Sequence, residues 1–270
     1  MVLENYDLLV DKKVLNLADF KEKDVFAILA LLLRNQQVMS VARVVEEEDN
    51  VFVASPGDLY GNFFDVTGVS RKARTSFVNS IKRIADNDLI VIKEVNGKKN
   101  DGTRRIQWNS LLKIDCNNLL HVSRKPYIIV GTEEINGIIY QDKMDFETLL
   151  QVYINIVSYI NQKDVSDADL GKIDLSYEIY GKMDIHLSCF ASINTLCTKR
   201  FSGDKNEEIW ISRPTMLKAL KLLEEIGAIA IVVPKKPKGC KQNFSNHYCY
   251  PRHKEMVQRI ADNYVKQVLS

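Results

Sequence analysis

Two stretches of the chain share one pattern, and this pattern decides the fold that the sequence predicts. They are VSRKARTSFVNSIKRIADNDLIVI at residues 69–92 and ISRPTMLKALKLLEEIGAI at residues 211–229. Each has a serine in second place, Ser70 or Ser212, whose hydroxyl can accept a hydrogen bond from a free backbone N–H and cap a helix. Apolar residues stand 8, 11 and 14 positions after each serine, namely Val78, Ile81 and Ile84, and Leu220, Leu223 and Ile226. This spacing predicts two amphipathic helices of the same kind.

A strand pattern follows each predicted helix. After the first helix, residues 89–95 are rich in β-branched residues, Asn96-Gly97 is a turn dipeptide, and residues 104–108 are expected to return as a second strand. After the second helix, Gly227 is a stop signal and residues 228–233 predict a strand. Residues 234–243 then form a basic loop, and residues 244–250 are the expected return strand. Each helix therefore leads into a hairpin with a basic turn.

Similar elements precede both stretches. Before the first, residues 24–34 predict a helix and residues 51–53 a strand, and Ser55-Pro56 begins a short helix. That short helix is expected to carry Leu59, Tyr60, Phe63 and Phe64 and to end at Thr67-Gly68-Val69. Before the second stretch, residues 146–160 and 191–200 predict helices, followed by a polar loop at 202–208.

The repeated order predicts an α+β, mostly α, fold with two winged helix-turn-helix domains in tandem. A length of 270 residues fits about two domains of ordinary size. We expect an N-terminal arm at residues 1–20, a first domain at 21–125, a second at 126–251, and a C-terminal helix at 252–270.

Composition excludes several classes of protein. With 46% hydrophobic and 27% charged residues, the chain is neither disordered nor collagen-like. The longest apolar run, residues 25–33, is far shorter than the roughly 20 residues that span a bilayer. Acidic residues near the N-terminus do not fit a signal peptide, and five cysteines without a C-x-x-C pair fit reduced thiols. We therefore expect a cytoplasmic protein with no membrane partner.

The net charge of +2 hides strongly segregated charges. Residues 70–83 contain five basic residues and no acid, and residues 226–254 contain no Asp or Glu at all. The balancing acids gather at residues 46–49 and 164–184. Such segregation creates a local potential that attracts a polyanion whatever the total charge. The alternative is that these clusters are ordinary solvated faces.

Placed on the predicted helices and hairpins, the basic and polar residues indicate double-stranded DNA as the partner. A recognition helix enters the major groove with its N-terminal residues toward the bases, where Arg suits guanine and Asn suits adenine. Basic residues of the hairpin turns are expected to contact phosphate. The candidate residues of the first copy are Ser70, Arg71, Lys72, Arg74, Thr75, Ser76, Asn79, Lys98, Lys99, Arg104 and Arg105. Those of the second copy are Ser212, Arg213, Lys218, Lys221, Lys235, Lys236, Lys238 and Lys241.

Motifs for catalysis or cofactors are not expected to contribute. The sequence has no G-x4-GK-[ST], no G-x-G-x-x-G and no G-x-S-x-G. Cys240, His247, Cys249 and His253 are a weak metal set because their spacing fits no usual zinc site, and His186, Cys189 and Cys197 are weaker still. We expect no enzyme activity, no cofactor and no bound metal.

The layout resembles the replication initiators of plasmids and phages and, more broadly, the initiator and regulator proteins of Gram-positive mobile elements. The second stretch, from Ser212 to Gly227, is similar to the S-x-x-T-hydrophobic…L-x-x-L-E-x-x-G ending of bacterial winged helices. The resemblance implies a non-catalytic, sequence-specific protein that binds the replication origin of a plasmid or phage-like element. It also implies a homodimer and host replication or transcription proteins as partners, because in this class one unit often serves dimerisation.

Two alternatives stay open at this point. A transcriptional regulator of the same kind of element needs the same DNA-reading surface as an initiator. A protein of another class would keep the two domains as a non-catalytic protein-interaction module. In that module the acidic, tyrosine-rich residues 153–180, which do not suit DNA, would face a partner protein or a second copy.

Overall fold

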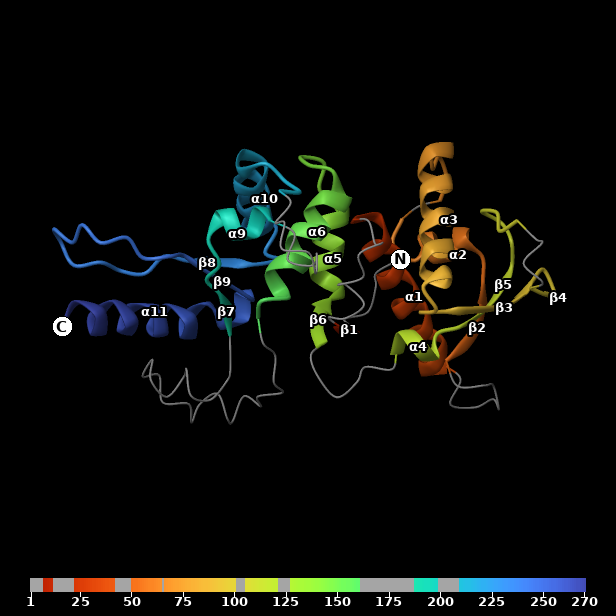
Figure 1. Ribbon diagram of the computed structural model, residues 1–270, viewed down its shortest axis with the longest axis horizontal. Coiled ribbons are helices and arrows are strands. Elements are labelled where there is room, and N and C mark those ends of the chain that lie inside the picture. Colours follow the sequence, from red (N-terminus) through yellow and green to blue (C-terminus); the bar gives the residue numbers. More distant parts are fainter. Residues whose placement is uncertain are drawn as a thin grey trace. The chain divides into compact units, whose positions relative to one another are not determined.

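The computed structural model describes residues 7–11, 22–41, 50–64, 66–100, 105–120, 127–160, 187–198 and 209–270. The chain is α+β, with helices in about half of these residues and two small antiparallel sheets. It divides into two compact units (Figure 1), Val10–Pro126 and Met1–Leu9 with Tyr127–Ser270. We call these the N-terminal unit and the C-terminal unit. A further pair of strands, β1 (Asp7–Asp11) and β6 (Tyr127–Gly131), forms a two-stranded sheet.

Among the described residues, the N-terminal unit combines four helices with a four-stranded sheet. Its elements are α1 (Glu22–Val41), β2 (Val51–Ala54), α2 (Pro56–Gly61), α3 (Arg71–Asp86), β3 (Val91–Val95), β4 (Lys98–Lys99), β5 (Leu112–Asp115) and a short α4 (Asn117–Leu120). The strands lie in the antiparallel order β2-β5-β3-β4. The unit is therefore organised around a small sheet in which the last strand, β5, lies between β2 and β3.

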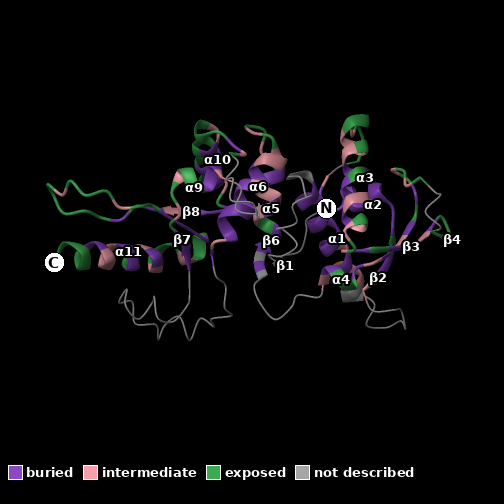
Figure 2. Ribbon diagram, in the orientation of Figure 1, coloured by how far each residue is buried: buried purple, intermediate pink, exposed green. Residues whose placement is uncertain are grey.

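An aromatic cluster joins the three main helices of this unit. The ring of Phe26 from α1 lies 5.6 Å from Tyr60 of α2 and 5.5 Å from Phe77 of α3. Around it the apolar run of α1, residues 25–33, is buried throughout (Figure 2). Burial of Phe77 in this cluster fixes which face of α3 turns inward.

The C-terminal unit has the same kinds of element. They are α5 (Thr132–Tyr140), α6 (Phe146–Val157), β7 (Ser188–Cys189), α9 (Ile193–Cys197), α10 (Arg213–Glu225), β8 (Ala230–Val232), β9 (His247–Cys249), the 3-10 turn η2 (Pro251–His253) and α11 (Lys254–Leu269). The strands lie in the antiparallel order β7-β9-β8. Helix α11 packs against this sheet through Val257, Ile260 and Ala261.

Strand order repeats between the two units. In each, the last strand of the sheet lies between the first and the second, as β2-β5-β3 and as β7-β9-β8. The preceding elements also correspond, since a helix, a strand, a short helix and a serine-capped helix come in that order. The internal repeat seen in the sequence is therefore also a repeat of topology.

Both predicted serine caps are confirmed. Ser70 Oγ accepts from the Ala73 N–H at 3.2 Å, and Ser212 Oγ accepts from the Thr215 N–H at 3.3 Å. At the other end, Gly227 has a φ of 75°, a left-handed conformation that suits glycine after a helix. The Asn96-Gly97 turn is confirmed too, with φ values of 52° and 71°.

Two predicted boundaries are wrong. The return strand expected at 104–108 is instead β5, because Leu112 and Ile114 alternate into the core, whereas residues 105–111 form no strand. Trp108 packs on the aromatic cluster, 5.4 Å from Tyr60. Helix α2 ends at Gly61, before the expected end at Thr67-Gly68-Val69, and Phe63 reaches the core from the turn that follows the helix.

Candidate nucleic-acid interface

Helix α3 presents a polar face opposite its buried one. Phe77, Val78, Ile81 and Ile84 are buried, while Arg71, Lys72, Thr75 and Asn79 are exposed. Lys72, Thr75 and Asn79 follow one another at helical spacing and form one stripe. Since the first turn contains no acidic residue, the positive end of the helix dipole stays uncompensated there.

The exposed side chains of α3 are free to bind. Among the described residues, Arg71, Lys72, Thr75 and Asn79 make no side-chain hydrogen bond and no ion pair. Two cations, a hydroxyl and an amide therefore share one unobstructed face. Donors of this kind suit phosphate oxygens and base edges.

Two arginines of α3 serve the fold instead of this face. Arg74, half-buried, donates from Nε to the Val69 carbonyl at 3.0 Å, and its guanidinium lies 5.6 Å from the centre of the Trp108 ring. Arg83 donates from Nε to Asp24 Oδ2 at 2.9 Å. The hydrogen bond to Asp24 raises the pKa of Arg83. Because Asp24 is 0% exposed, this ion pair holds α3 against α1.

The segment between β3 and β5, which contains β4 and which we call the β3–β5 loop, carries the other basic candidate residues of this unit. Lys98, Lys99 and Arg105 are exposed, whereas Arg104 lies outside the described residues. Between α3 and this β3–β5 loop is a cleft of about 590 Å³, lined by Lys82 of α3 and by Asn100 and Arg105 of the loop. Asp86 and Asp88 also line it, at the C-terminal end of α3. Helix and loop thus border one polar cleft.

Helix α10 presents a different outer face. Arg213, Leu217, Lys218 and Lys221 are exposed, with Leu217 at 48%. Arg213 donates to Asn194 Oδ1 at 3.4 Å, and Lys221 Nζ lies 3.8 Å from Glu225 Oε1. The last turn is therefore acidic, and two of the three basic residues of α10, Arg213 and Lys221, already have polar neighbours.

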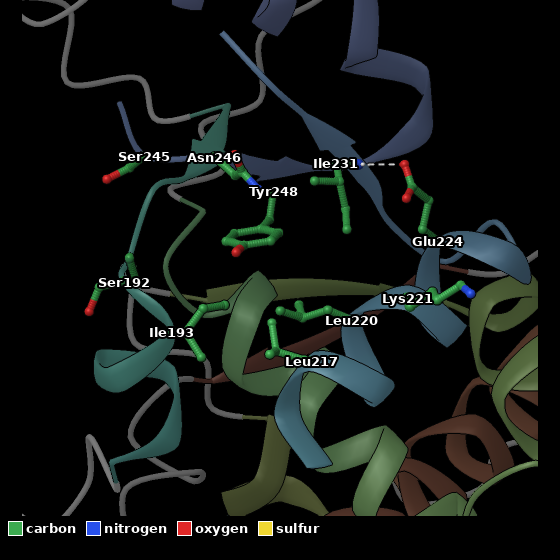
Figure 3. A pocket seen from close by; sticks show the side chains of 11 residues that line it. Ser192, Ile193, Leu217, Leu220, Lys221, Glu224, Ile231, Ser245, Asn246 and Tyr248 are labelled. Atoms are coloured by element: carbon green, nitrogen blue, oxygen red, sulfur yellow. Dashed lines mark hydrogen bonds between the residues drawn. The ribbon is translucent and has the colours of Figure 1, made fainter. Parts of the chain in front are cut away.

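A groove of about 400 Å³ runs beside α10 in the C-terminal unit. In Figure 3 the side chains of Ile193, Leu220 and Tyr248 converge on it from α9, α10 and β9. At one end Glu224 Oε1 accepts the Ile231 backbone N–H at 3.3 Å. The groove beside α10 is therefore mainly apolar, unlike the cleft beside α3.

The loop between β8 and β9, residues 233–246, holds the remaining predicted phosphate contacts. Lys235, Lys236, Lys238 and Lys241 are exposed, and the loop contains no acid. Lys236 Nζ donates to Asn243 Oδ1 at 3.4 Å, across the loop. The four lysines form the densest run of positive charge among the described residues of this unit.

Two members of the weak metal set, His247 and Cys249, are buried in this unit. His247, at 8% exposure, lies with Nδ1 3.0 Å from Ser188 Oγ, and burial lowers its pKa. Burial also raises the pKa of Cys249 to about 12, so its thiol stays protonated in the core. In the described part of the chain, no three His, Cys, Asp or Glu residues are placed to hold a metal ion, and His186 lies outside that part.

Sequence reasoning missed two residues that border these surfaces. Lys82 follows Lys72, Thr75 and Asn79 at the next helical turn, so the same spacing would have found it. Asp262 of α11 accepts the Lys235 backbone N–H at 2.8 Å, and no pattern in the sequence indicates this contact.

No helix in the ranges that the structure describes is long and apolar enough to cross a membrane. Comparison with known protein families, curated proteins and solved structures found no match for this chain.

Proposed function

We propose that this chain is a sequence-specific, double-stranded DNA-binding protein. One observation carries the proposal: α3 exposes Arg71, Lys72, Thr75 and Asn79 on one face, without partners among the described residues. An α-helix fits the major groove, and its N-terminal residues then face the bases. A free face of cations and amides at that end of a helix is the chemistry that such a contact needs.

We propose further that each unit is a winged helix-turn-helix domain. Support comes from the repeated strand order, in which β5 and β9 lie centrally, and from the serine-capped helix that precedes β3 or β8. In this arrangement α2 and α3, or α9 and α10, form the two-helix element. The β3–β5 and β8–β9 loops would be the wings, and both carry exposed lysines.

Each group would have its own task in this function. Arg71 would donate to guanine and Asn79 would pair with adenine, so these residues would set sequence preference. The lysines of the two loops would contact phosphate and supply affinity that depends on salt. None of these steps makes or breaks a bond, and we propose no catalytic activity.

The resemblance described above favours an initiator that binds repeated sites at the origin of a plasmid or phage-like element. A transcriptional regulator would use the same surface, and the arrangement of the bound sites separates the two. Tandem direct repeats beside an AT-rich stretch support initiation. A single palindrome overlapping a promoter supports regulation.

Protein interaction is a second candidate function for the C-terminal unit. It is favoured by the apolar groove beside α10 and by the exposed Leu217 at its edge. Apolar patches of this kind suit protein partners better than phosphate. If this candidate held for the whole chain, duplex binding would be absent.

Selection of bound sequences from a random duplex pool, using the full chain, tests the main proposal. We expect enrichment of one sequence class, and an affinity for it that falls roughly 10³-fold or more between about 50 and 200 mM salt if six or more phosphates are contacted. Arg71→Ala and Asn79→Ala variants serve as controls for base reading. No enrichment together with an affinity insensitive to salt would refute DNA binding.

A further inference from the structure

Helix α11 runs beside the β8–β9 loop and contacts its outgoing arm (Figure 1). The backbone N–H of Lys235 donates to Asp262 Oδ1 at 2.8 Å, and Gln258 Nε2 donates to the Val233 carbonyl at 3.1 Å. Gln258 Nε2 also donates to Asp262 Oδ1 at 2.8 Å, which orients the carboxylate. Two neighbouring residues of the loop are thus held through their backbone.

The returning arm of the loop contacts the same helix. Phe244 meets Tyr264 edge to face, with ring centroids 6.1 Å apart. Between the two arms, Lys236 Nζ donates to Asn243 Oδ1. Both arms of the loop are therefore tied, one to Gln258 and Asp262 and the other to Tyr264.

The first half of α11 is anchored in the core of its unit. Val257, Ile260 and Ala261 are buried with Val232 of β8 and Cys249 of β9, the strands at the two ends of the loop. The loop itself forms no strand at residues 233–246, so no ladder of backbone hydrogen bonds holds it. Contacts from α11 take the place of that ladder.

We propose, on the DNA-binding function put forward above, that Asp262 is a positioning residue for the phosphate contacts of the C-terminal unit. By holding the Lys235 backbone, Asp262 fixes the loop that displays Lys236, Lys238 and Lys241. Side chains on a fixed loop lose less freedom when they bind, so affinity is higher than for the same lysines on a loose loop. An acidic residue would therefore strengthen binding to a polyanion.

This assignment predicts that removing the Asp262 carboxylate weakens DNA binding, which is opposite to the effect expected from charge alone. Removing a carboxylate near a DNA-binding surface ordinarily strengthens binding, since it raises the positive charge. Glu255 provides a matched control, because it is exposed on the same helix and has no side-chain partner among the described residues. Asp262→Ala and Glu255→Ala change the charge equally, but only the first releases the Lys235 backbone, together with the ion pair between Asp262 Oδ2 and Lys235 Nζ, 3.9 Å apart.

The experiment uses the full chain and two measurements. Hydrogen exchange at residues 233–246 is compared without DNA in wild type, Asp262→Ala and Glu255→Ala. Affinity for the selected duplex is then measured at several salt concentrations. We expect Asp262→Ala to speed exchange of the Lys235 amide and to weaken binding roughly fivefold to tenfold. Glu255→Ala should leave exchange unchanged and bind as tightly as wild type or more tightly.

Two further variants separate positioning from a general loss of structure. Asp262→Asn keeps an oxygen that can accept the Lys235 N–H, so it should restore both slow exchange and affinity. In a background carrying Lys236→Ala, Lys238→Ala and Lys241→Ala, Asp262→Ala should have no additional effect on binding. Gln258→Ala, which changes no charge, should weaken binding in the same direction.

Some results would overturn the assignment. Unchanged exchange in Asp262→Ala would show that Asp262 does not hold the loop. Faster exchange with unchanged or tighter binding would show that the position of the loop does not affect the affinity for DNA. Additive loss in the background without the three lysines would overturn it as well. If wild type bound no duplex, the DNA function itself would fail, and the exchange comparison would still show whether Asp262 orders the loop.

Discussion

Helices α3 and α10 have the same cap and the same buried stripe, yet their outer faces differ. At the exposed positions where α3 has Lys72, Thr75, Asn79 and Lys82, the aligned residues of α10 are Pro214, Leu217, Lys221 and Glu224. The cap and the buried stripe specify the helix and its orientation. Outer residues are not constrained by either, so the two copies have kept one architecture with different surface chemistry.

The spaces beside the two helices differ in the same way. The lining of the cleft beside α3 mixes charged side chains, among them Lys82 and Arg105, with apolar ones, whereas the groove beside α10 is mainly apolar. In the C-terminal unit the densest run of exposed positive charge lies on the β8–β9 loop instead. On the proposed function, the N-terminal unit would supply most of the sequence preference and the C-terminal unit mainly phosphate affinity.

The largest expected effect concerns Arg83 and its aligned residue in α10, Glu225. Arg83→Ala removes the cation that pairs with the buried Asp24, which we expect to cost roughly 3 kcal/mol of the stability of the N-terminal unit. Glu225 is paired with Lys143 at 2.8 Å on the surface, where water screens the charges. Glu225→Ala should therefore be far milder. Urea unfolding followed by hydrogen exchange in each unit measures both, and equal losses would contradict the difference in burial.

The Arg83 ion pair is a contact that could not be predicted from the sequence. Helical spacing located the buried stripe of α3, and the serine, glycine and Asn-Gly signals placed its cap and the neighbouring turn, because these are local properties. Arg83 lies at the edge of the stripe, and its partner is 59 residues away, so local spacing could not assign it. The same holds for Asp262, which meets Lys235 only because α11 turns back along the loop.

Strand boundaries failed for a related reason. Residues 104–108 contain Ile106 and Trp108 in alternation, as a strand would. In the structure the strand instead contains Leu112 and Ile114, because this segment pairs with β2 and β3. Pairing across a sheet is a tertiary property, and a short alternating run does not specify it. The candidate binding residues were easier to find, because exposed charge on a capped helix needs only the helix.

Base reading is expected to be unequal between the two helices. Asn79→Ala should reduce discrimination between the selected duplex and its variants by about 1–3 kcal/mol, because a bidentate amide contact is lost. Lys221→Ala at the aligned position should weaken binding to all duplexes alike. Competition binding with single-base variants of the selected site measures both. If Lys221→Ala altered sequence preference and Asn79→Ala did not, the roles of the two helices would be reversed.

Lysines of the two loops should act on salt dependence. Lys236→Ala is expected to flatten the slope of log affinity against log salt by about one, without changing the preferred sequence. Lys98→Ala in the β3–β5 loop should do the same if both loops contact phosphate. Titrations at four or more salt concentrations give the slopes. A slope changed by one loop alone would restrict phosphate binding to that unit.

The smallest expected effect is a pH dependence of the C-terminal unit. His247 is buried against Ser188, and burial holds its pKa below the usual 6.5. Because the unfolded chain binds this proton more readily, stability is complete above about pH 6.5 and falls as the pH drops toward the lower folded-state pKa. The slope should not exceed about 1.4 kcal/mol per pH unit for one group. Hydrogen exchange of β9 between about pH 7.5 and 5.5 measures the fall, corrected for intrinsic exchange rates, and His247→Gln should remove it. A fall of the same size in that variant would assign the pH dependence to other groups and leave His247 only a packing role.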